Sequence, residues 1–285
     1  MNNCWMNGEL MPVSEAHVSV LDHGVLYGDG IFEGLRFYNR KIFRVDAHIK
    51  RLQCSAKAIA LDLPYNLSQL KDAMEQLIEN FEQSEGYLRL VVTRGKGKLG
   101  INPFNCETPS VFIIADSLDM VTAEARQKGI TLKTAATRRL TPDGLDPKIK
   151  SLNYLNHIMA RIEAHSAGAD DALLLNAMGY VTEASVANVF IVSENILYTP
   201  KVSDGVLNGI TRGAVIEAAN NLGMECQETS LTLYDIYTAD ECFLTGTGAE
   251  LMPVSAVDGR RYEDMDRPGF NALQQAFWDL VATDC

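Results

Sequence analysis

The chain has few of the features that mark secreted, membrane-spanning or nucleic-acid-binding proteins. Its six cysteines are scattered over 285 residues with no CxxC pair and no zinc-ligand spacing, which excludes a disulfide framework and favours reduced thiols. No apolar run is long enough to span a bilayer, and no basic region followed by an apolar run indicates a signal peptide. A net charge of −12 argues against a nucleic-acid surface. We therefore expect a soluble cytoplasmic enzyme of metabolism with no metal, nucleic-acid or membrane partner.

The chain also lacks the loops that bind nucleotides. The segments 28–30 and 95–100 are rich in glycine, but neither has the strand–GxGxxG–helix setting of a dinucleotide site. The turn at 245–250 is not followed by the Lys-Ser/Thr pair of a Walker loop. A redox or nucleotide enzyme is therefore disfavoured. A non-catalytic binding protein that keeps the fold of an enzyme is the alternative from another class.

What the chain contains is the composition of a globular protein. Hydrophobic residues make up 47% and charged residues 22% of the chain, which is enough for a sizeable core. Predicted strands outnumber helices and occur in runs, which favours two α+β domains over one doubly wound sheet. We expect a small N-terminal domain at 1–118, a linker at 116–120 and a large C-terminal domain at 119–285.

Apolar periodicity and turn residues predict the individual elements. Strands are expected near 4–6, 17–20, 34–38, 41–45, 87–93, 111–115, 130–136, 172–176, 189–192, 196–198, 225–229 and 241–244. Helices are expected over 46–62, from an N-cap at Ser68, before Gly129, after Lys150 to about 167, over 211–222 and over 269–282.

One lysine lies where a short polar loop is predicted to lead into a long amphipathic helix. It is Lys150, in the segment Asp146–Leu155. An amine at such a junction can point into a cleft and form a Schiff base with a carbonyl cofactor. A solvated loop lysine is the alternative interpretation, and Lys148 is the rival for any special role.

Other residues could supply the remaining needs of pyridoxal phosphate, namely an acid for the pyridine nitrogen and an anion site for the phosphate. Glu183 lies in a largely buried neighbourhood and needs a cationic partner, either a pyridinium or an arginine. Arg51 lies on the predicted helix over 46–62, and its planar fork suits phosphate. Free amides where the helix starts at 208–212, and the turn at 245–250, offer anion sites.

Taken together, these segments resemble the class IV aminotransferases, which are pyridoxal-phosphate enzymes of fold type IV. The resemblance covers Tyr27–Gly34, His48–Leu52, Lys150–Tyr154, Gly179–Phe190, Gly209–Arg212 and Gly246–Pro253. It implies a two-domain α+β fold like that of D-amino-acid aminotransferase, with a pseudo-barrel in the C-terminal domain. It further implies that this domain carries the catalytic lysine, that pyridoxal 5′-phosphate lies at the domain interface, and that the protein is a homodimer or higher homo-oligomer.

The resemblance also implies roles for individual residues. Lys150, not Lys148, would form the Schiff base and shuttle a proton between the substrate Cα and C4′ of the cofactor. Glu183 would pair with the pyridine nitrogen, and Tyr154 would donate to the ring oxygen. The remaining implied cofactor residues are Leu207 against the ring face and Arg51, Ile210, Thr211, Gly246 and Thr247 around the phosphate. Retention of the whole set argues against a non-catalytic binding protein.

Within the family, the segment Tyr87–Arg89 resembles the Tyr-x-Arg of branched-chain aminotransferases, in which both residues help receive the substrate α-carboxylate. This implies ping-pong transamination between a branched-chain L-amino acid (valine, leucine or isoleucine) and 2-oxoglutarate. Tyr27 would reach across a dimer interface, and Gly248 stands where some relatives have alanine. The implied substrate residues are Tyr27, Phe32, Gly34, Tyr87, Arg89, Thr247 and Gly248.

Three relatives remain as alternatives: a D-amino-acid aminotransferase, an (R)-selective amine transaminase and aminodeoxychorismate lyase. The D-specific branch carries its carboxylate-binding basic groups on the loop after the strand, where Arg94, Lys96 and Lys98 keep that option open. The lyase usually departs at the turn that reads Gly246-Thr247 here. The segment Thr137–Pro147 has no role that the sequence assigns.

Overall fold

The computed structural model describes residues 3–117, 123–263 and 266–285. Two compact units divide the chain. Unit 1 comprises Met1–Leu118, Ile149–Asn153 and Asp284–Cys285, and unit 2 comprises Asp119–Lys148 and Tyr154–Thr283. The segment that carries Lys150 therefore packs with unit 1, whereas the sequence led us to expect it in the C-terminal domain. The linker predicted at 116–120 lies partly outside the described residues.

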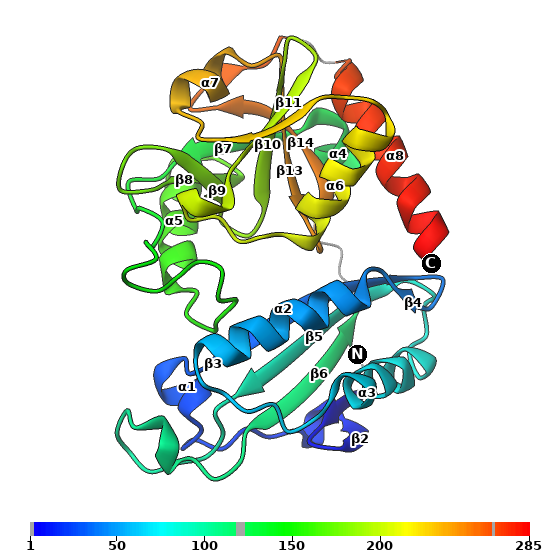
Figure 1. The fold of residues 1–285 in the computed structure, drawn as a ribbon, viewed down its shortest axis with the longest axis vertical. Helices are drawn as coiled ribbons and strands as arrows, with labels where there is room; N and C mark the ends of the chain where they lie inside the picture. The colour runs from blue at the N-terminus through cyan, green and yellow to red at the C-terminus, as the bar shows by residue number, and fades with distance from the viewer. Residues whose placement is uncertain (1–2, 118–122, 264–265) are drawn as a thin grey trace. The chain divides into compact units, whose positions relative to one another are not determined.

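Unit 1 is built on one antiparallel sheet with the strand order β2-β1-β6-β5-β3-β4, and α2 and α3 pack on it (Figure 1). Its strands are β1 (Asn3–Met6), β2 (Glu9–Pro12), β3 (Gly30–Tyr38), β4 (Lys41–Ile42), β5 (Gly86–Thr93) and β6 (Ser110–Asp116). Its helices are α1 (His23–Tyr27), α2 (Val45–Ala58) and α3 (Leu67–Glu79), with short 3-10 turns at Val13–Glu15 and Pro103–Asn105.

Alternation along β3 divides its side chains between the two faces of the sheet. Ile31 and Leu35 are fully buried in a core shared with α2 and α3, and each such side chain stabilises the fold by roughly 1.5–3 kcal/mol. Glu33 lies between them and therefore also faces α2. Phe32 and Gly34 face the other way. The strand thus presents one acid to the helix layer and two predicted substrate residues to the opposite face.

The helix layer of unit 1 shows how one boundary was misplaced. The side chain of Asn66 accepts from the backbone N–H of Gln69, and the Gln69 side chain accepts from the backbone N–H of Asn66. This capping box starts α3 at Leu67, so the predicted N-cap at Ser68 is wrong. The strand expected at 17–20 does not form in the described structure, and the one at 41–45 is limited to Lys41–Ile42.

The segment around Lys150 pairs with β3 and does not form the first turn of a helix. The Phe32 N–H donates to the Lys150 carbonyl at 3.0 Å, and the Leu152 N–H donates to the Gly30 carbonyl at 2.9 Å. Helix α5 begins only at Leu155. The helix predicted after Lys150 therefore forms, but it begins only at Leu155, because the residues before it pair with β3. This pairing fixes the backbone of Lys150 against the strand that carries Phe32 and Glu33.

Unit 2 is built on a nine-stranded mixed sheet with the order β12-β11-β10-β13-β14-β7-β8-β9, in which β15 pairs with β14. Because β9 also pairs with β10, six of the strands close into a barrel, in agreement with the predicted α+β class and pseudo-barrel. The strands are β7 (Ile130–Thr134), β8 (Asp171–Leu175), β9 (Val181–Ala184), β10 (Asn188–Ser193), β11 (Ile196–Pro200), β12 (Cys226–Thr229), β13 (Glu241–Gly246), β14 (Glu250–Val257) and β15 (Arg260–Arg261). The helices are α4 (Ala123–Lys128), α5 (Leu155–Ser166), α6 (Ile210–Asn221), α7 (Leu233–Thr238) and α8 (Pro268–Asp284), with a 3-10 turn at Val202–Asp204.

All six cysteines are free thiols. In the ranges that the structure describes, no helix combines the length and the apolar character needed to cross a membrane.

Candidate active site

A buried group of three charged or polar side chains joins β3 to α2 in unit 1. The Glu33 carboxylate accepts from Nε and Nη2 of Arg51 at 2.8 and 2.7 Å, and from Nδ1 of His48 at 2.8 Å. The Glu33 side chain is 1% exposed and that of Arg51 12% exposed. His48 and Arg51 are three residues apart and therefore share one face of α2. The predicted phosphate ligand Arg51 is thus held side-on by an acid that the sequence analysis did not single out.

The electrostatics of this group favour a charged Glu33 beside a neutral His48. Burial by itself raises the pKa of Glu33, but the charge and hydrogen bonds of Arg51, together with the hydrogen bond from His48, outweigh it and lower the pKa to about 2. Burial lowers the pKa of His48 despite its bond to Glu33, and the charges of Arg51 and Lys150 lower it further. A neutral His48 that faces a carboxylate through Nδ1 must carry its proton on that nitrogen.

Lys150 lies within unit 1 next to the same helix. Its backbone N–H donates to Oγ of Ser55 on α2 at 3.2 Å, and its Nζ lies 4.6 Å from the centroid of the Phe32 ring. Lys148, in contrast, is 58% exposed and its Nζ pairs with Asp146 at 3.1 Å. The two lysines that the sequence analysis weighed are thus placed differently, and only Lys150 is part of a built site.

The predicted substrate residues Phe32, Gly34, Tyr87 and Arg89 lie together on one face of the sheet. Register pairs Gly34 with Arg89. Nε of Arg89 donates to the Tyr87 hydroxyl at 3.2 Å, and the Arg89 guanidinium lies 4.6 Å from the Phe32 ring centroid. Burial raises the pKa of Tyr87, which keeps its hydroxyl protonated. A Cβ at position 34 would lie 2.0 Å from the Tyr87 hydroxyl oxygen, so glycine is required there for Tyr87 to take its place.

Tyr27 makes different contacts from those four residues. Its hydroxyl accepts from the Gly100 N–H at 2.9 Å, and its ring packs edge-on against His23 with the centroids 5.0 Å apart. The side chain is 37% exposed. Within unit 1, Tyr27 therefore belongs to the neighbourhood of α1 and residue 100.

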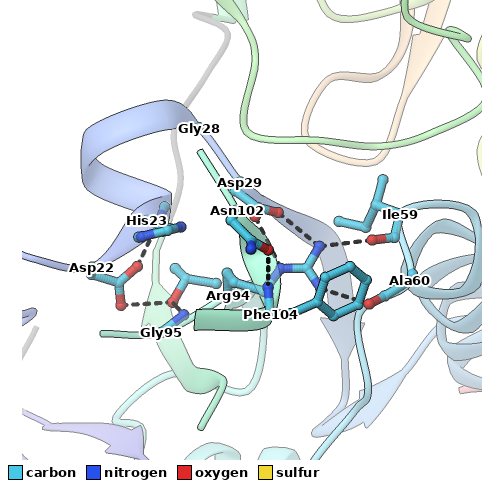
Figure 2. A network of polar contacts seen from close by, with 12 residues as sticks. Asp22, His23, Gly28, Asp29, Ile59, Ala60, Arg94, Gly95, Asn102 and Phe104 are labelled. Carbon is cyan, nitrogen blue, oxygen red and sulfur yellow. Dashed lines mark hydrogen bonds and ion pairs between the residues drawn. The ribbon is translucent and has the colours of Figure 1, made fainter. Parts of the chain in front are cut away.

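Figure 2 shows Arg94, a third arginine of unit 1, whose hydrogen bonds go to other residues of the same unit. Nε and Nη2 of Arg94 donate to the two carboxylate oxygens of Asp29 at 2.9 and 3.0 Å. Nη1 donates to the carbonyl of Ala60 at 2.6 Å, and Nη2 also donates to that of Ile59 at 2.7 Å. Arg94 is 7% exposed. Its guanidinium ties the end of α2 to the turn before β3 and is not placed to receive a substrate carboxylate.

Unit 2 contains a second buried group built from the same three residue types. Oε1 of Glu183 forms an ion pair with Nε of Arg139 at 2.8 Å, and both side chains are 6% exposed. Nη1 of Arg139 lies 3.0 Å from Nε2 of His157. Nδ1 of His157 lies 2.6 Å from the Ser185 carbonyl. Arginine was one of the two partners expected for Glu183, and it comes from the segment 137–147, to which the sequence assigned no role.

The backbone before α6 also contacts Glu183. The Leu207 N–H donates to Oε2 of Glu183 at 3.0 Å, and the Asn188 amide reaches the same oxygen at 3.4 Å and the Leu207 carbonyl at 3.0 Å. Leu207, predicted to pack against the cofactor ring, therefore also fixes the acid. A Cβ at Gly209 would lie 2.0 Å from Oδ1 of Asn188, so the chain can approach Asn188 closely only with glycine at this position.

The predicted phosphate residues Ile210 and Thr211 form the first turn of α6. The first helical hydrogen bond runs from the Gly213 N–H to the Gly209 carbonyl, and in the described structure no side chain caps this helix. The amides of residues 210–212 therefore have no acceptor within the helix, which is the arrangement that attracts anions. Thr211 itself is buried.

A tight hairpin between β13 and β14 carries the other predicted cofactor and substrate residues of unit 2. Gly246 pairs with Glu250, so Thr247 and Gly248 lie in the turn, where both are half-buried. Just before them, Oγ1 of Thr245 is buried and has no hydrogen-bond partner among the described residues. Tyr154 lies at the start of α5, stacked on His157 with the ring centroids 4.4 Å apart.

The residues that sequence reasoning missed are the supports of those it found. They are Glu33, His48, Arg139, Asn188 and His157. One signal was available: Glu33 occupies a core-facing position between Ile31 and Leu35, where a charged residue needs a buried partner. The pairing of Arg139 with Glu183 joins distant segments, and no local pattern indicates it.

Comparison with known proteins gives one consistent answer. The family profile for amino-transferase class IV matches residues 30–257. Over 256 residues the chain is 45% identical to a Methanocaldococcus jannaschii protein with a provisional branched-chain-amino-acid aminotransferase name, covering 90% of this chain and 88% of that protein.

Two solved structures are similar over the whole chain. The Escherichia coli branched-chain amino acid aminotransferase has a TM-score of 0.95 at 32% identity, covering 99% of this chain and 95% of that one. The branched-chain amino acid aminotransferase of Thermobaculum terrenum, in its pyridoxal-phosphate form, has a TM-score of 0.90 at 28% identity, covering 100% of this chain and 95% of that one. With a family profile over most of its length and relatives this similar, the chain belongs to the class IV aminotransferases, the pyridoxal-phosphate enzymes of fold type IV.

Proposed function

We propose that this protein catalyses transamination between a branched-chain L-amino acid and 2-oxoglutarate by a ping-pong mechanism with pyridoxal 5′-phosphate. The observation that carries the proposal is the group formed by Tyr87, Arg89 and Phe32 beside the amine of Lys150. It combines a cation and a hydroxyl for a carboxylate with an aromatic wall for an apolar side chain. The names of the similar proteins support the same substrate class.

The donor set of the chain fits the cofactor. Its phosphate needs amides and a cation, which the first turn of α6 and Arg51 can supply. Its pyridine nitrogen needs a buried acid, which Glu183 can supply, and the buried hydroxyl of Thr245 is a further donor in the same unit. Arg51 belongs to unit 1, whereas Glu183, Thr245 and the first turn of α6 belong to unit 2. When bound, the cofactor ring takes up the electron pair released from the substrate Cα.

The side chains of the chain then have separate tasks. Lys150 moves the proton between the substrate Cα and C4′ of the cofactor, held near the Phe32 face by its paired backbone. Glu183 keeps a proton on the pyridine nitrogen, and Tyr154 orients the ring oxygen. The remaining proposed cofactor contacts are Leu207 at the ring face, and Ile210, Thr211, Gly246 and Thr247 at the phosphate.

We assign substrate selection mainly to side chains on one face of the unit 1 sheet. Arg89 and Tyr87 would receive the α-carboxylate, because a guanidinium and a hydroxyl in contact present two donors to one anion. Phe32 and Gly34 would border the aliphatic side chain, with Tyr27, Thr247 and Gly248 as further proposed contacts. The commitment of Arg94 to Asp29 and to two backbone carbonyls removes one basic group that a D-specific enzyme would need on the next loop. It therefore favours the L-amino acid.

We further propose a cytoplasmic homodimer. Six free cysteines suit a reducing compartment. Dimerisation would give the half-exposed Tyr27 a partner site to enter. Size-exclusion chromatography with light scattering measures the oligomer directly, and a monomeric active enzyme would refute it.

A panel of four amino donors with 2-oxoglutarate tests the proposed activity. L-Valine and L-leucine should give glutamate, whereas D-alanine and (R)-1-phenylethylamine should not. The purified protein should be yellow, and borohydride should attach the cofactor to a peptide that contains Lys150. A colourless protein that takes up no cofactor would sink the enzyme assignment. Turnover of D-alanine alone would transfer the protein to the D-specific branch.

A further inference from the structure

We propose that Glu33 is a positioning residue for the cofactor phosphate, acting through Arg51, and that His48 fixes the Glu33 carboxylate for this task. The inference rests on the proposed function, because it takes Arg51 as a phosphate ligand. It adds two residues whose proposed role is carried out through Arg51. Their contribution is to set the direction in which one guanidinium points.

The geometry of the pair supports orientation as its role. Glu33 accepts from Nε and Nη2 of Arg51, which lie on one edge of the planar guanidinium. Two parallel bonds to one carboxylate fix both the plane and the rotation of the group. A guanidinium carries five N–H groups, so this edge-on pairing engages two of them and fixes the direction of the other edge.

His48 provides a further hydrogen bond that restricts the Glu33 carboxylate. Its Nδ1 donates to Oε2 of Glu33 at 2.8 Å, and the imidazole is 2% exposed. The carboxylate is therefore held by β3 through its own backbone and by α2 through two side chains. A carboxylate with three donors in a buried site has little freedom to rotate. The orientation of the Arg51 guanidinium is fixed as a result.

Charge alone does not explain the arrangement. A buried carboxylate in contact with Arg51 offsets the positive charge that a phosphate would feel, and burying such a pair carries a desolvation cost. A site selected only for cationic strength would leave Arg51 without an acid. The pairing makes sense if the gain is a guanidinium already placed for the phosphate, since a correctly oriented group binds without losing further rotational freedom.

The pair Asp29–Arg94 provides an internal contrast and a control. It has the same two-point geometry in the same unit, but the guanidinium also donates to the carbonyls of Ile59 and Ala60. Asp29→Asn therefore breaks an equivalent acid–arginine pair that has no proposed connection with the cofactor. It separates loss of positioning from general loosening of unit 1.

The test compares pyridoxamine 5′-phosphate with pyridoxamine, which differ only in the phosphate and cannot form an imine with Lys150. Equilibrium dialysis of the apo-enzyme gives both Kd values. The Kd of pyridoxamine divided by the Kd of pyridoxamine 5′-phosphate measures the contribution of the phosphate, and this ratio falls when phosphate binding weakens. Glu33→Gln should lower this ratio about tenfold. In an Arg51→Gln background, the same change should leave the ratio unaltered. Asp29→Asn should lower the melting temperature and leave the ratio at the wild-type value.

Each outcome supports or overturns the inference. If Glu33→Gln does not fold, Glu33→Asp carries the test, because it keeps the charge but withdraws the carboxylate by one methylene group and should also lower the ratio. An unchanged or increased ratio in a folded Glu33 variant overturns the inference, as does an equal loss in Asp29→Asn. If the wild-type protein shows no preference for the phosphorylated probe, the proposed function itself fails, which is a different result.

Discussion

Each of the two units buries one glutamate, one arginine and one histidine in contact, and the order of contacts differs. In unit 1 the acid is central: Glu33 receives both Arg51 and His48. In unit 2 the arginine is central: Arg139 contacts Glu183 on one side and His157 on the other. The same three residue types therefore hold an arginine at the edge of the group in unit 1 and a glutamate at the edge of the group in unit 2.

In each group of three, the central residue holds a peripheral residue in position. That peripheral residue is the one proposed to contact the cofactor, and we call it the working group. In unit 1 the peripheral cation Arg51 is proposed to meet a phosphate. In unit 2 the peripheral acid Glu183 is proposed to meet a pyridine nitrogen. Histidine keeps the support in place in both. A cofactor with an anion and a basic ring nitrogen needs one working group of each charge, and the two arrangements supply them.

Removing the Lys150 amine should have the largest effect on activity, and it leaves the Glu33 group of unit 1 and the Arg139 group of unit 2 intact. Lys150→Ala is expected to lower the rate of L-valine transamination by roughly 10⁴-fold or more, since the proton carrier is lost. The melting temperature should change little, because the backbone hydrogen bonds at 150 remain. Stopped-flow and steady-state assays with L-valine measure the loss. Near-normal turnover would show that another lysine does the work, and Lys148→Ala is the matched control that should retain activity.

Glu183→Gln tests the proposed role of the buried acid in unit 2. Loss of the negative charge should lower kcat by on the order of 100-fold, with the cofactor still bound through its phosphate. Steady-state kinetics and the visible spectrum report the two quantities separately.

The control for this variant is Glu228→Gln, which removes the acid from another buried arginine of unit 2. Arg212 pairs with Glu228 at 2.6 Å, and the Arg212 side chain is 3% exposed. This change should affect stability and leave kcat near the wild-type value. Equal losses of kcat in the two variants would mean that Glu183 acts only as a structural partner of Arg139.

Gly34→Ala tests the substrate face of β3, next to Glu33. The new methyl group would overlap the Tyr87 hydroxyl, so Tyr87 must move away from Arg89. KM for L-valine should rise about tenfold with a smaller change in kcat and no change in phosphate affinity. Gly213→Ala on α6 is the control: nothing lies within 4 Å of the added Cβ, and alanine should stabilise the helix by about 0.5–1 kcal/mol. An unchanged KM in Gly34→Ala would remove Tyr87 from the carboxylate site.

Local patterns predicted most of the strands and helices because alternation and helical spacing are local properties. The start of α3 also follows a local rule, although it was predicted at the wrong residue. Asn66 has Gln69 three residues later, as a capping box requires, whereas Ser68 is followed at that spacing by Lys71. The strands β2, β9 and β14 were not predicted, although the four-residue strands β1 and β12 were, so strand length alone does not decide which strands a local pattern indicates.

The failures around the site have a different cause. The backbone of Lys150 pairs with β3, more than a hundred residues earlier, and no local pattern reports such a partner. The support of Glu183 by Arg139 likewise joins distant segments. Motif resemblance pointed to the proposed working residues, but their supports depend on tertiary contacts that only the fold reveals.

The smallest predicted effect concerns His48 and the pH dependence of stability. Its folded-state pKa is lowered from 6.5 by burial, with Arg51 and Lys150 adding to the effect and Glu33 opposing it. Below pH 6.5 the unfolded chain therefore binds a proton at this position that the folded chain rejects, so stability falls as the pH decreases. One such proton contributes a slope of at most about 1.4 kcal/mol per pH unit. His48→Gln should flatten the slope between pH 7 and 5, measured by urea unfolding, whatever its effect at pH 7. Parallel slopes for wild type and variant would show that His48 is protonated in the fold, and the Glu33 support in unit 1 would then rest on two cations.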